Sequence, residues 1–243
     1  MSTLLLAAPL LAALAAPAAL DLADVDDLPL TVVPSDGPTT SYAIFLTGDG
    51  GWAHLASSVA DDLAQHGVTT IGFSTLRYFW SPKPPLRTAA DLNRIFAAIH
   101  SAAPAAKIEL IGYSYGAAII PVVYPLLDDA AKDMVSRLAL MMPDAKAGIV
   151  EDDAPPPAPG AAPVYDFSTT FWSDDDPAAG YDIAAAIRGD NALPVLCVYS
   201  ADDDGACPAL AVAPPANVTL KVLGEGHHFG GDYDALAALV LAN

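Results

Sequence analysis

A serine between two closely spaced glycines is the strongest chemical signal in this sequence. Ser114 is the central residue of the pentapeptide 112–116, Gly-Tyr-Ser-Tyr-Gly, which follows a predicted buried strand over residues 108–111. Glycines two residues before and two residues after a serine allow a sharp turn from a strand into a helix, and such a turn exposes the hydroxyl. The pentapeptide alone would also fit an ordinary tight turn. Its place between a strand and a helix predicts that Ser114 is a nucleophile.

A serine nucleophile needs a base that accepts its proton and an acid that orients the base. After a turn of this kind, the acid precedes the histidine along the chain. The predicted strand 195–199 ends in an acidic loop. The acid at this strand end usually lies three residues after the turn residue that closes the strand, which selects Asp203 and leaves Asp202 as the alternative. A solvated acidic loop with no catalytic role is the competing interpretation.

Two adjacent histidines follow the next predicted strand, 218–223, in the segment Gly-Glu-Gly-His-His-Phe. The Gly-x-Gly-His arrangement predicts His227 as the base and leaves His228 as the alternative. Paired histidines can also bind a metal, but no nearby cysteine or third histidine completes such a site, so we expect no metal. The other three histidines fall on predicted helices and are expected at the surface: His54, His66 and His100.

The oxyanion hole of such a site combines two main-chain N–H groups. One is expected from Tyr115, and the other from Asp49 in the glycine-rich loop 48–51. A glycine-rich loop can also bind phosphate, but this one lacks the Lys and Ser/Thr of a P-loop and the spacing of a dinucleotide motif. We therefore expect no cofactor.

The elements that position these residues alternate between short apolar runs and longer amphipathic stretches. This alternation predicts the α/β class, and the Ser–acid–His order predicts the α/β-hydrolase fold, a mostly parallel central sheet flanked by helices. Thr88 is a candidate helix N-cap, and residues 76–85 are expected to form a long loop. The predicted strands are 41–46, 68–73, 108–111, 135–142, 195–199 and 218–223, and the predicted helices are 52–65, 88–102, a segment after Ser114, and 233–241.

Length and composition fit one such domain: the chain has 243 residues, of which 53% are hydrophobic and 16% charged. Residues 1–20 are predicted to be a secretory signal peptide, because an apolar run with small residues near its end precedes an acidic stretch. No Lys or Arg precedes that run, so an uncleaved anchor is the alternative. Residues 21–243 would form the single domain, with residues 143–190 as a cap-like or flexible insertion.

The formal net charge is −19, with only ten basic residues in the chain. Such a chain would be repelled by phosphate backbones, which excludes nucleic acid as an expected partner. Solubility is the simple explanation of this acidity, and a field that attracts cationic substrates is the alternative. The two cysteines, Cys197 and Cys207, lie ten residues apart. Export favours a disulfide between them, and two reduced thiols are the alternative.

Four further motifs accompany the serine turn, and two of them, through the segments 76–80 and 226–229, are far more specific than the serine turn. They are Gly48-Asp49-Gly50-Gly51-Trp52, Ser74-Thr75-Leu76-Arg77-Tyr78-Phe79-Trp80, Cys197-Val198-Tyr199 through Cys207-Pro208, and Gly226-His227-His228-Phe229. From residue 42 onward the chain resembles the VirJ/AcvB family of bacterial periplasmic α/β-hydrolase proteins. The resemblance implies a periplasmic protein, a virulence or type IV secretion association in some members, hydrolysis of lysyl-phosphatidylglycerol in others, and a Cys197–Cys207 disulfide. The chain departs from the family pattern at Ala118, where Asp is usual, and over residues 143–190.

These observations together predict a periplasmic serine esterase, in which Ser114 attacks an aminoacyl ester, His227 transfers the proton and Asp203 holds the imidazole. Arg77 and Trp52 are expected to contact the substrate, with Arg77 facing a lipid phosphate, although stacking of Arg77 on its aromatic neighbours is the alternative. The expected partners are a small-molecule or lipid ester and, transiently, a membrane surface. Two other functions stay open: a thioesterase or peptidase on the same scaffold, and a non-catalytic periplasmic protein that binds secretion-system components.

Overall fold

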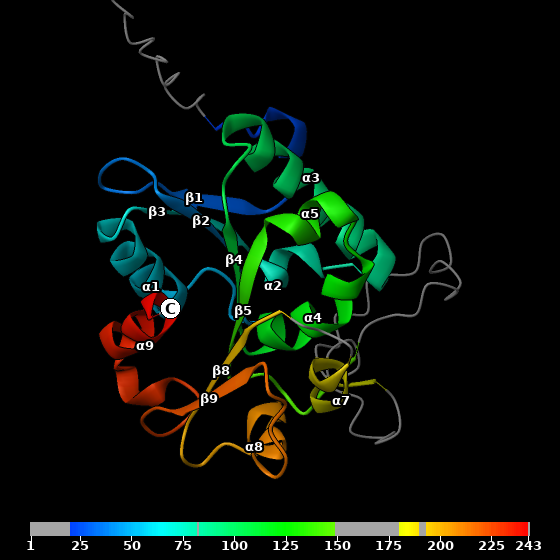
Figure 1. Cartoon of the computed structure of the whole chain (residues 1–243), viewed down its shortest axis with the longest axis vertical. Coiled ribbons are helices and arrows are strands. Elements are labelled where there is room, and N and C mark those ends of the chain that lie inside the picture. Colours follow the sequence, from blue (N-terminus) through cyan, green and yellow to red (C-terminus); the bar gives the residue numbers. More distant parts are fainter. Residues whose placement is uncertain (1–19, 82, 149–179, 190–192, 243) are drawn as a thin grey trace, which may run out of the picture.

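Seven strands form one central sheet in the computed structural model, which describes residues 20–81, 83–148, 180–189 and 193–242 (Figure 1). The strand order is β1-β3-β2-β4-β5-β8-β9, and all neighbouring pairs are parallel except β1 and β3. This mostly parallel sheet confirms the predicted α/β architecture. The strands are β1 (Leu30–Val33), β2 (Ser41–Leu46), β3 (Val68–Phe73), β4 (Ile108–Tyr113), β5 (Val135–Met141), β8 (Val195–Tyr199) and β9 (Val218–Val222).

Helices cover both faces of the sheet, and each face has its own apolar core (Figure 1). One core packs the sheet against α1 (His54–Gln65) and α9 (Tyr233–Leu241). The other packs it against a larger group of helices: α3 (Pro85–Ala102), α4 (Tyr115–Val123), α5 (Asp129–Met134), α7 (Ile183–Arg188) and α8 (Ala206–Ala211). The central strands read as continuous apolar runs in the sequence because both of their faces are buried.

The remaining described elements are short. A small antiparallel pair, β6 (Lys146–Ala147) and β7 (Tyr181–Asp182), stands apart from the main sheet. The predicted signal peptide falls outside the described residues except for its last residue, and so does the larger part of the predicted insertion, residues 149–179. Within the described ranges, every helix is too short or too polar to cross a bilayer.

The segment after β3 differs from the prediction of a long loop over residues 76–85. It begins with a short helix, α2 (Thr75–Tyr78), because the Ser74 hydroxyl accepts a hydrogen bond from the Arg77 N–H. The following helix α3 begins at Pro85, so Thr88 is not its N-cap. Proline fits the first turn of a helix, where its missing N–H is not needed. Thr88 instead lies inside the helix and donates its hydroxyl to the carbonyl of Pro84.

The loops that carry the predicted functional residues lie at one edge of the sheet. They follow β2, β4, β8 and β9, and the carboxyl ends of parallel strands lie at the same edge. Loops at this edge are the usual place for a ligand in an open α/β sheet. The topology therefore gathers the predicted nucleophile, acid, base and oxyanion loop, although they are spread over nearly 180 residues of sequence, from Asp49 to His227.

Candidate active site

Ser114 occupies the turn between β4 and α4, with its backbone in the left-handed region at a φ of 52°. A non-glycine residue in this conformation is strained and persists only where its neighbours fix it. The Ser114 N–H donates to the carbonyl of Met141 at 2.8 Å, and the Ser114 carbonyl accepts from the Ala118 N–H at 3.0 Å. Because the residue is only 6% exposed, its hydroxyl is presented from a fixed position.

The two flanking glycines are required by close backbone approaches. A Cβ on Gly116 would lie 2.3 Å from the carbonyl oxygen of Leu46, and a Cβ on Gly112 would lie 2.6 Å from the Cα of Ala117. Both distances are far below van der Waals contact, and the clashing atoms belong to the backbone, which cannot swing away. The helix after the serine can therefore pack against β2 only because these positions have no side chain.

His227 is the histidine that the structure brings to the serine. Its Nε2 lies 2.9 Å from Ser114 Oγ, whereas His228 instead has its Nδ1 3.2 Å from the Tyr113 hydroxyl. Tyr113 also donates to the main-chain carbonyl of His227 at 3.0 Å. Burial lowers the pKa of His227 from its ordinary value, and the neighbouring His228 adds to this effect. A lowered pKa keeps the imidazole neutral, and so able to accept a proton, near pH 7.

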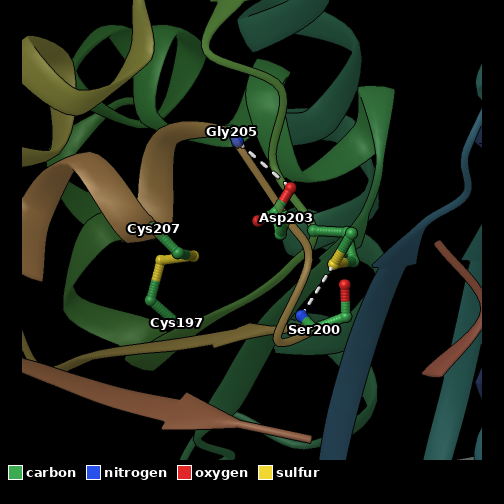
Figure 2. Close-up of a disulfide and its surroundings, with 6 residues drawn as sticks. Cys197, Ser200, Asp203, Gly205 and Cys207 are labelled. Atoms are coloured by element: carbon green, nitrogen blue, oxygen red, sulfur yellow. Dashed lines mark hydrogen bonds between the residues drawn. A yellow bond between two sulfur atoms is a disulfide. The ribbon is translucent and has the colours of Figure 1, made fainter. Parts of the chain in front are cut away.

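The two candidate acids differ in what their carboxylates bind. Asp202 accepts a hydrogen bond from the Gly226 N–H at 2.7 Å, which ties the acidic loop to the histidine loop. Asp203 accepts from the Gly205 N–H at 3.1 Å through Oδ1 (Figure 2), and its Oδ2 is buried with no hydrogen-bond partner among the described residues. Burial raises the pKa of Asp203, partly offset by the Gly205 N–H. Neither carboxylate is hydrogen-bonded to His227 in the described part of the chain.

A disulfide closes the loop that carries both candidate acids (Figure 2). Cys197 on β8 and Cys207 on α8 are bonded with their Cα atoms 5.8 Å apart, and both are fully buried. The bond therefore fixes the acidic loop between the sheet and a helix, and the expected pairing is formed.

The loop after β2 lies directly beside the serine. A Cβ on Gly48 would lie 3.1 Å from the Cβ of Ser114, so this loop approaches the nucleophile closely. Thr75 holds it, because its hydroxyl lies 2.8 Å from the Thr47 carbonyl and 2.9 Å from the Gly48 carbonyl. The exposed Asp49 forms no hydrogen bond through its main-chain N–H to any described residue. The sequence does not predict this role of Thr75, because Thr75 follows β3 and can hold the loop after β2 only when these two strands are neighbours.

Asp144 is a half-buried carboxylate at the same edge that no motif indicated. Burial, followed by the charges of Asp49 and Asp203, raises its pKa to about 7. The available signal was its place three residues after the end of β5, which matches the place of the acidic loop after β8. Asp49 and Asp203 are thus near enough to Asp144 to act on its charge, but within the described residues no three acidic, histidine or cysteine side chains gather closely enough to hold a metal.

The structure gives other surroundings to the two residues expected to contact the substrate. Trp52 packs edge-on against Phe45 with ring centroids 6.0 Å apart, and it fills the space above Gly72, where a Cβ would lie 2.1 Å from its ring. This packing alone accounts for the tryptophan. Arg77 is exposed on α2 and lines a separate surface cavity. A substrate contact by either residue remains a prediction.

Solved structures of the α/β-hydrolase fold are similar to this chain over most of its length. A thioesterase domain from the curacin biosynthetic pathway has a TM-score of 0.59 at 14% identity, covering 88% of this chain and 94% of that one. An α/β serine hydrolase homologue from Coxiella burnetii has a TM-score of 0.57 at 17% identity, covering 87% and 89%. A proline iminopeptidase from Mycobacterium smegmatis has a TM-score of 0.56 at 14% identity, covering 87% and 92%. At these identities the likeness establishes the fold.

No curated protein matches the chain at a significant level. The family model described as bacterial virulence protein (VirJ) does match it, over residues 40–150 and 160–243. This match includes the serine turn, the disulfide-closed acidic loop and the paired histidines. The chain therefore belongs to the VirJ family of bacterial virulence proteins.

Proposed function

We propose that this protein is a serine hydrolase that cleaves an ester through Ser114, His227 and Asp203. The 2.9 Å contact between His227 Nε2 and Ser114 Oγ carries the proposal, because it joins a strained nucleophile to a base with a lowered pKa. With Nε2 facing the serine, the other ring nitrogen of His227 is left for the acid. The buried Oδ2 of Asp203, which has no hydrogen-bond partner in the described part of the chain, suits that role, since such hydrogen bonds often form fully only with substrate bound.

The reaction follows from these positions. Ser114 Oγ attacks the ester carbonyl while its proton passes to His227 Nε2, and the oxyanion accepts hydrogen bonds from the main-chain N–H groups of Tyr115 and Asp49. Collapse of this intermediate breaks the ester bond, and the leaving alcohol takes the proton from His227. A water then gives a proton to His227 and attacks the acyl-serine. Collapse of this second intermediate breaks the bond between the acyl group and Ser114, and the proton returns from His227 to Ser114 Oγ as the carboxylic acid is released.

The charges around the serine favour an acyl group that carries a positive charge. Asp49 and Asp203 both act on Asp144 electrostatically, so the charges that shift the pKa of Asp144 are both carboxylates. Three carboxylates would oppose an oxyanion unless the substrate supplied a cation. An aminoacyl ester does so through its ammonium groups. Together with the family likeness, this supports lysyl-phosphatidylglycerol as the substrate and the periplasm as the place of action.

The experiment is to incubate the purified protein with lysyl-phosphatidylglycerol and measure the release of free lysine. Ser114→Ala is the control for activity from contaminating enzymes. Lysine release by the wild type alone supports the proposal. Turnover of uncharged esters without lysine release would support the proposed hydrolase activity and contradict the proposed aminoacyl substrate. No turnover of any ester by a folded wild-type protein would instead favour the non-catalytic binding role in a secretion system.

A further inference from the structure

A surface cavity of about 480 Å³ lies between the segment that leads into β1, helix α2 and the first turns of α3. Leu30, at the start of β1, pairs with Phe73, at the end of β3, so this cavity opens at the same sheet edge as the serine turn. Strand β3 is two strands away from β4, which corresponds to roughly 10 Å. The charged residues lining the cavity are Asp26, Asp27, Arg77, Lys83, Arg87 and Asp91.

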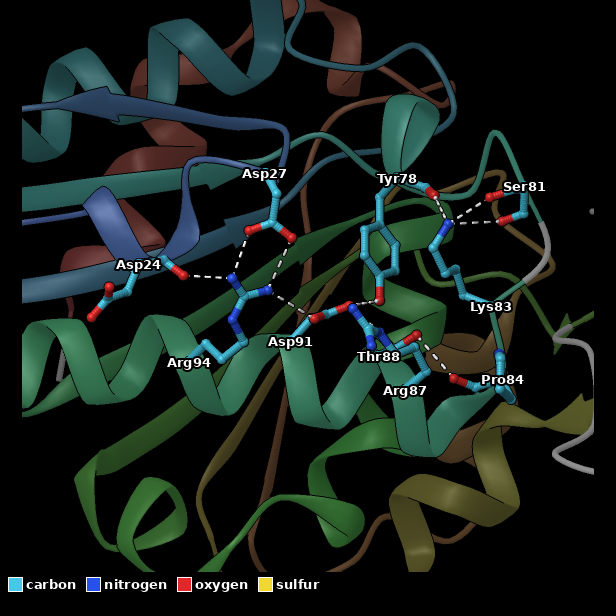
Figure 3. A network of polar contacts seen from close by, with 10 residues as sticks. All are labelled: Asp24, Asp27, Tyr78, Ser81, Lys83, Pro84, Arg87, Thr88, Asp91 and Arg94. Carbon is cyan, nitrogen blue, oxygen red and sulfur yellow. Dashed lines mark hydrogen bonds and ion pairs between the residues drawn. The ribbon is translucent and has the colours of Figure 1, made fainter.

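Two of the three lining carboxylates are already neutralised by partners (Figure 3). Asp91 is 2% exposed and accepts hydrogen bonds from the Tyr78 hydroxyl at 2.7 Å, from Arg87 Nε at 2.9 Å and from Arg94 at 3.2 Å. Arg94 also pairs with Asp27 at 2.6 Å. Asp26 is the one lining carboxylate with no such partner among the described residues.

Two lining cations are not used by this network. Arg77 is exposed, and its side chain forms no hydrogen bond or ion pair with any described residue. Lys83 donates to the main-chain carbonyls of Tyr78 and Ser81, at 3.0 and 3.3 Å, and to the Ser81 hydroxyl at 2.7 Å, which fixes its ammonium group without neutralising it. With Arg87 and Arg94, these residues are four of the ten basic residues in a chain of net charge −19. Because Asp27, Asp91, Arg87 and Arg94 pair with one another, Arg77, Lys83 and Asp26 are the lining charges outside the network, and the cavity has a small excess of positive charge.

Large apolar side chains are exposed on the same segment. Trp80 is 51% exposed and Leu86 is 54% exposed, and they alternate in sequence with Arg77, Lys83 and Arg87. Tryptophan and aliphatic side chains interleaved with cations suit the interface between water and an anionic bilayer, where cations contact phosphates and apolar groups enter the headgroup layer.

We propose that this cavity binds a phosphate group of an anionic lipid surface, with Arg77 as its contact and the charge of Lys83 beside it. The inference extends the proposed function, because a lipid substrate of Ser114 would lie in such a surface and the two sites share one sheet edge. It concerns binding alone, so its test does not need hydrolysis.

The test compares Arg77→Gln with Lys221→Gln, both made in a Ser114→Ala background so that lipid is not consumed. Lys221 is an exposed lysine on β9, and β9 and β1 are the two outermost strands of the sheet. Its substitution removes the same charge as Arg77→Gln. Cosedimentation with phosphatidylglycerol vesicles and calorimetric titration with soluble glycerol phosphate are the two probes. Equal melting temperatures show that both variants are folded.

Binding to phosphatidylglycerol vesicles is expected to weaken roughly five-fold in Arg77→Gln and to stay unchanged in Lys221→Gln. If Arg77→Gln also weakens the binding of glycerol phosphate, the cavity accepts phosphate from either source. If Arg77→Gln weakens only the binding of vesicles, the cavity requires a lipid surface. Equal binding of both probes by the two variants would overturn the proposal. If the protein with Ser114 intact releases no lysine while vesicle binding still depends on Arg77, the result counts against the proposed hydrolysis alone.

Discussion

Tyr113 donates its hydroxyl to the main-chain carbonyl of His227 at 3.0 Å. Tyr113 directly precedes the proposed nucleophile, so the turn that exposes Ser114 also holds the loop that carries the proposed base. The ring of Tyr113 lies 5.3 Å from the ring of His227, which adds packing to the hydrogen bond. The two halves of the site are thus joined by one side chain.

Replacing Tyr113 with Phe should lower kcat roughly ten-fold while KM stays nearly constant. The change removes a hydrogen bond that positions His227, and a bond of this kind is worth on the order of 1 kcal/mol. Steady-state kinetics on a lipid or model ester would measure it. His228→Ala is the matched control, since it leaves the Tyr113–His227 bond in place. An effect of Tyr113→Phe on KM alone would contradict a positioning role.

Replacing Gly116 with Ala should destabilise the fold by roughly 3 kcal/mol or prevent folding. The added Cβ would lie 2.3 Å from the Leu46 carbonyl oxygen, so β2 and α4 would have to separate. Gly37→Ala is the control, because a Cβ there meets nothing within 4 Å. Urea unfolding of the two variants measures the difference. Similar unfolding midpoints would show that the turn does not need its glycine.

The pH dependence of activity should differ between cationic and neutral esters. The pKa of Asp144 is raised to about 7, so its carboxyl is largely neutral at pH 6 and ionised at pH 8. The kcat/KM for a lysyl ester should therefore rise through this range more steeply than that for a neutral ester. Asp144→Asn should remove the difference. Parallel pH profiles for both esters in the wild type would argue against an ammonium contact at Asp144.

The same substitution has an effect on stability with a defined sign. Because the folded state raises the pKa of Asp144, it holds the proton more tightly than the unfolded state between pH 4 and 7. The contribution of Asp144 to the free energy of unfolding therefore falls as pH rises through this window. Asp144→Asn should be more stable than the wild type at pH 8, as measured by thermal unfolding.

Removing the disulfide should lower the free energy of unfolding by about 3 kcal/mol or somewhat less, the amount expected for a short closed loop. Activity should fall as well, because the bond fixes the loop that carries Asp203. The Cys197→Ala/Cys207→Ala double variant is to be compared with the wild type before and after reduction. If reduction changes the double variant as strongly as the wild type, the effect does not come from this bond.

The order and type of the central elements could be predicted because they leave local signals. Strands buried on both faces read as continuous apolar runs, and β8 and α9 have the bounds expected from the sequence. The glycine pattern around Ser114 is also local, since each glycine meets backbone that every chain of this topology brings close. The start of α3 was missed because Pro84 and Pro85 suggested a loop, whereas Pro85 serves as the first residue of the helix.

The details of the site depend on contacts between distant segments. Whether His227 or His228 faces the serine is set by the backbone after β9 and by Tyr113, which is more than 110 residues away. The sequence offers only the place of Asp144 after β5 as a signal and none for Thr75, because the roles of both arise from neighbouring strands. The pairing of Asp91 with Tyr78 joins two separate elements, and its pairing with Arg87 depends on the first turn of α3, which begins before the helix that the sequence predicts.

Fluorophosphonate labelling of the purified protein tests the central claim most directly, because the reagent reacts only with an activated serine. The wild type and His228→Ala should be labelled, whereas Ser114→Ala should not be labelled and His227→Ala should be labelled at least a hundred-fold more slowly. Labelling that persists in Ser114→Ala, or that is absent from a folded wild-type protein, would contradict the assignment of Ser114 and His227 as nucleophile and base.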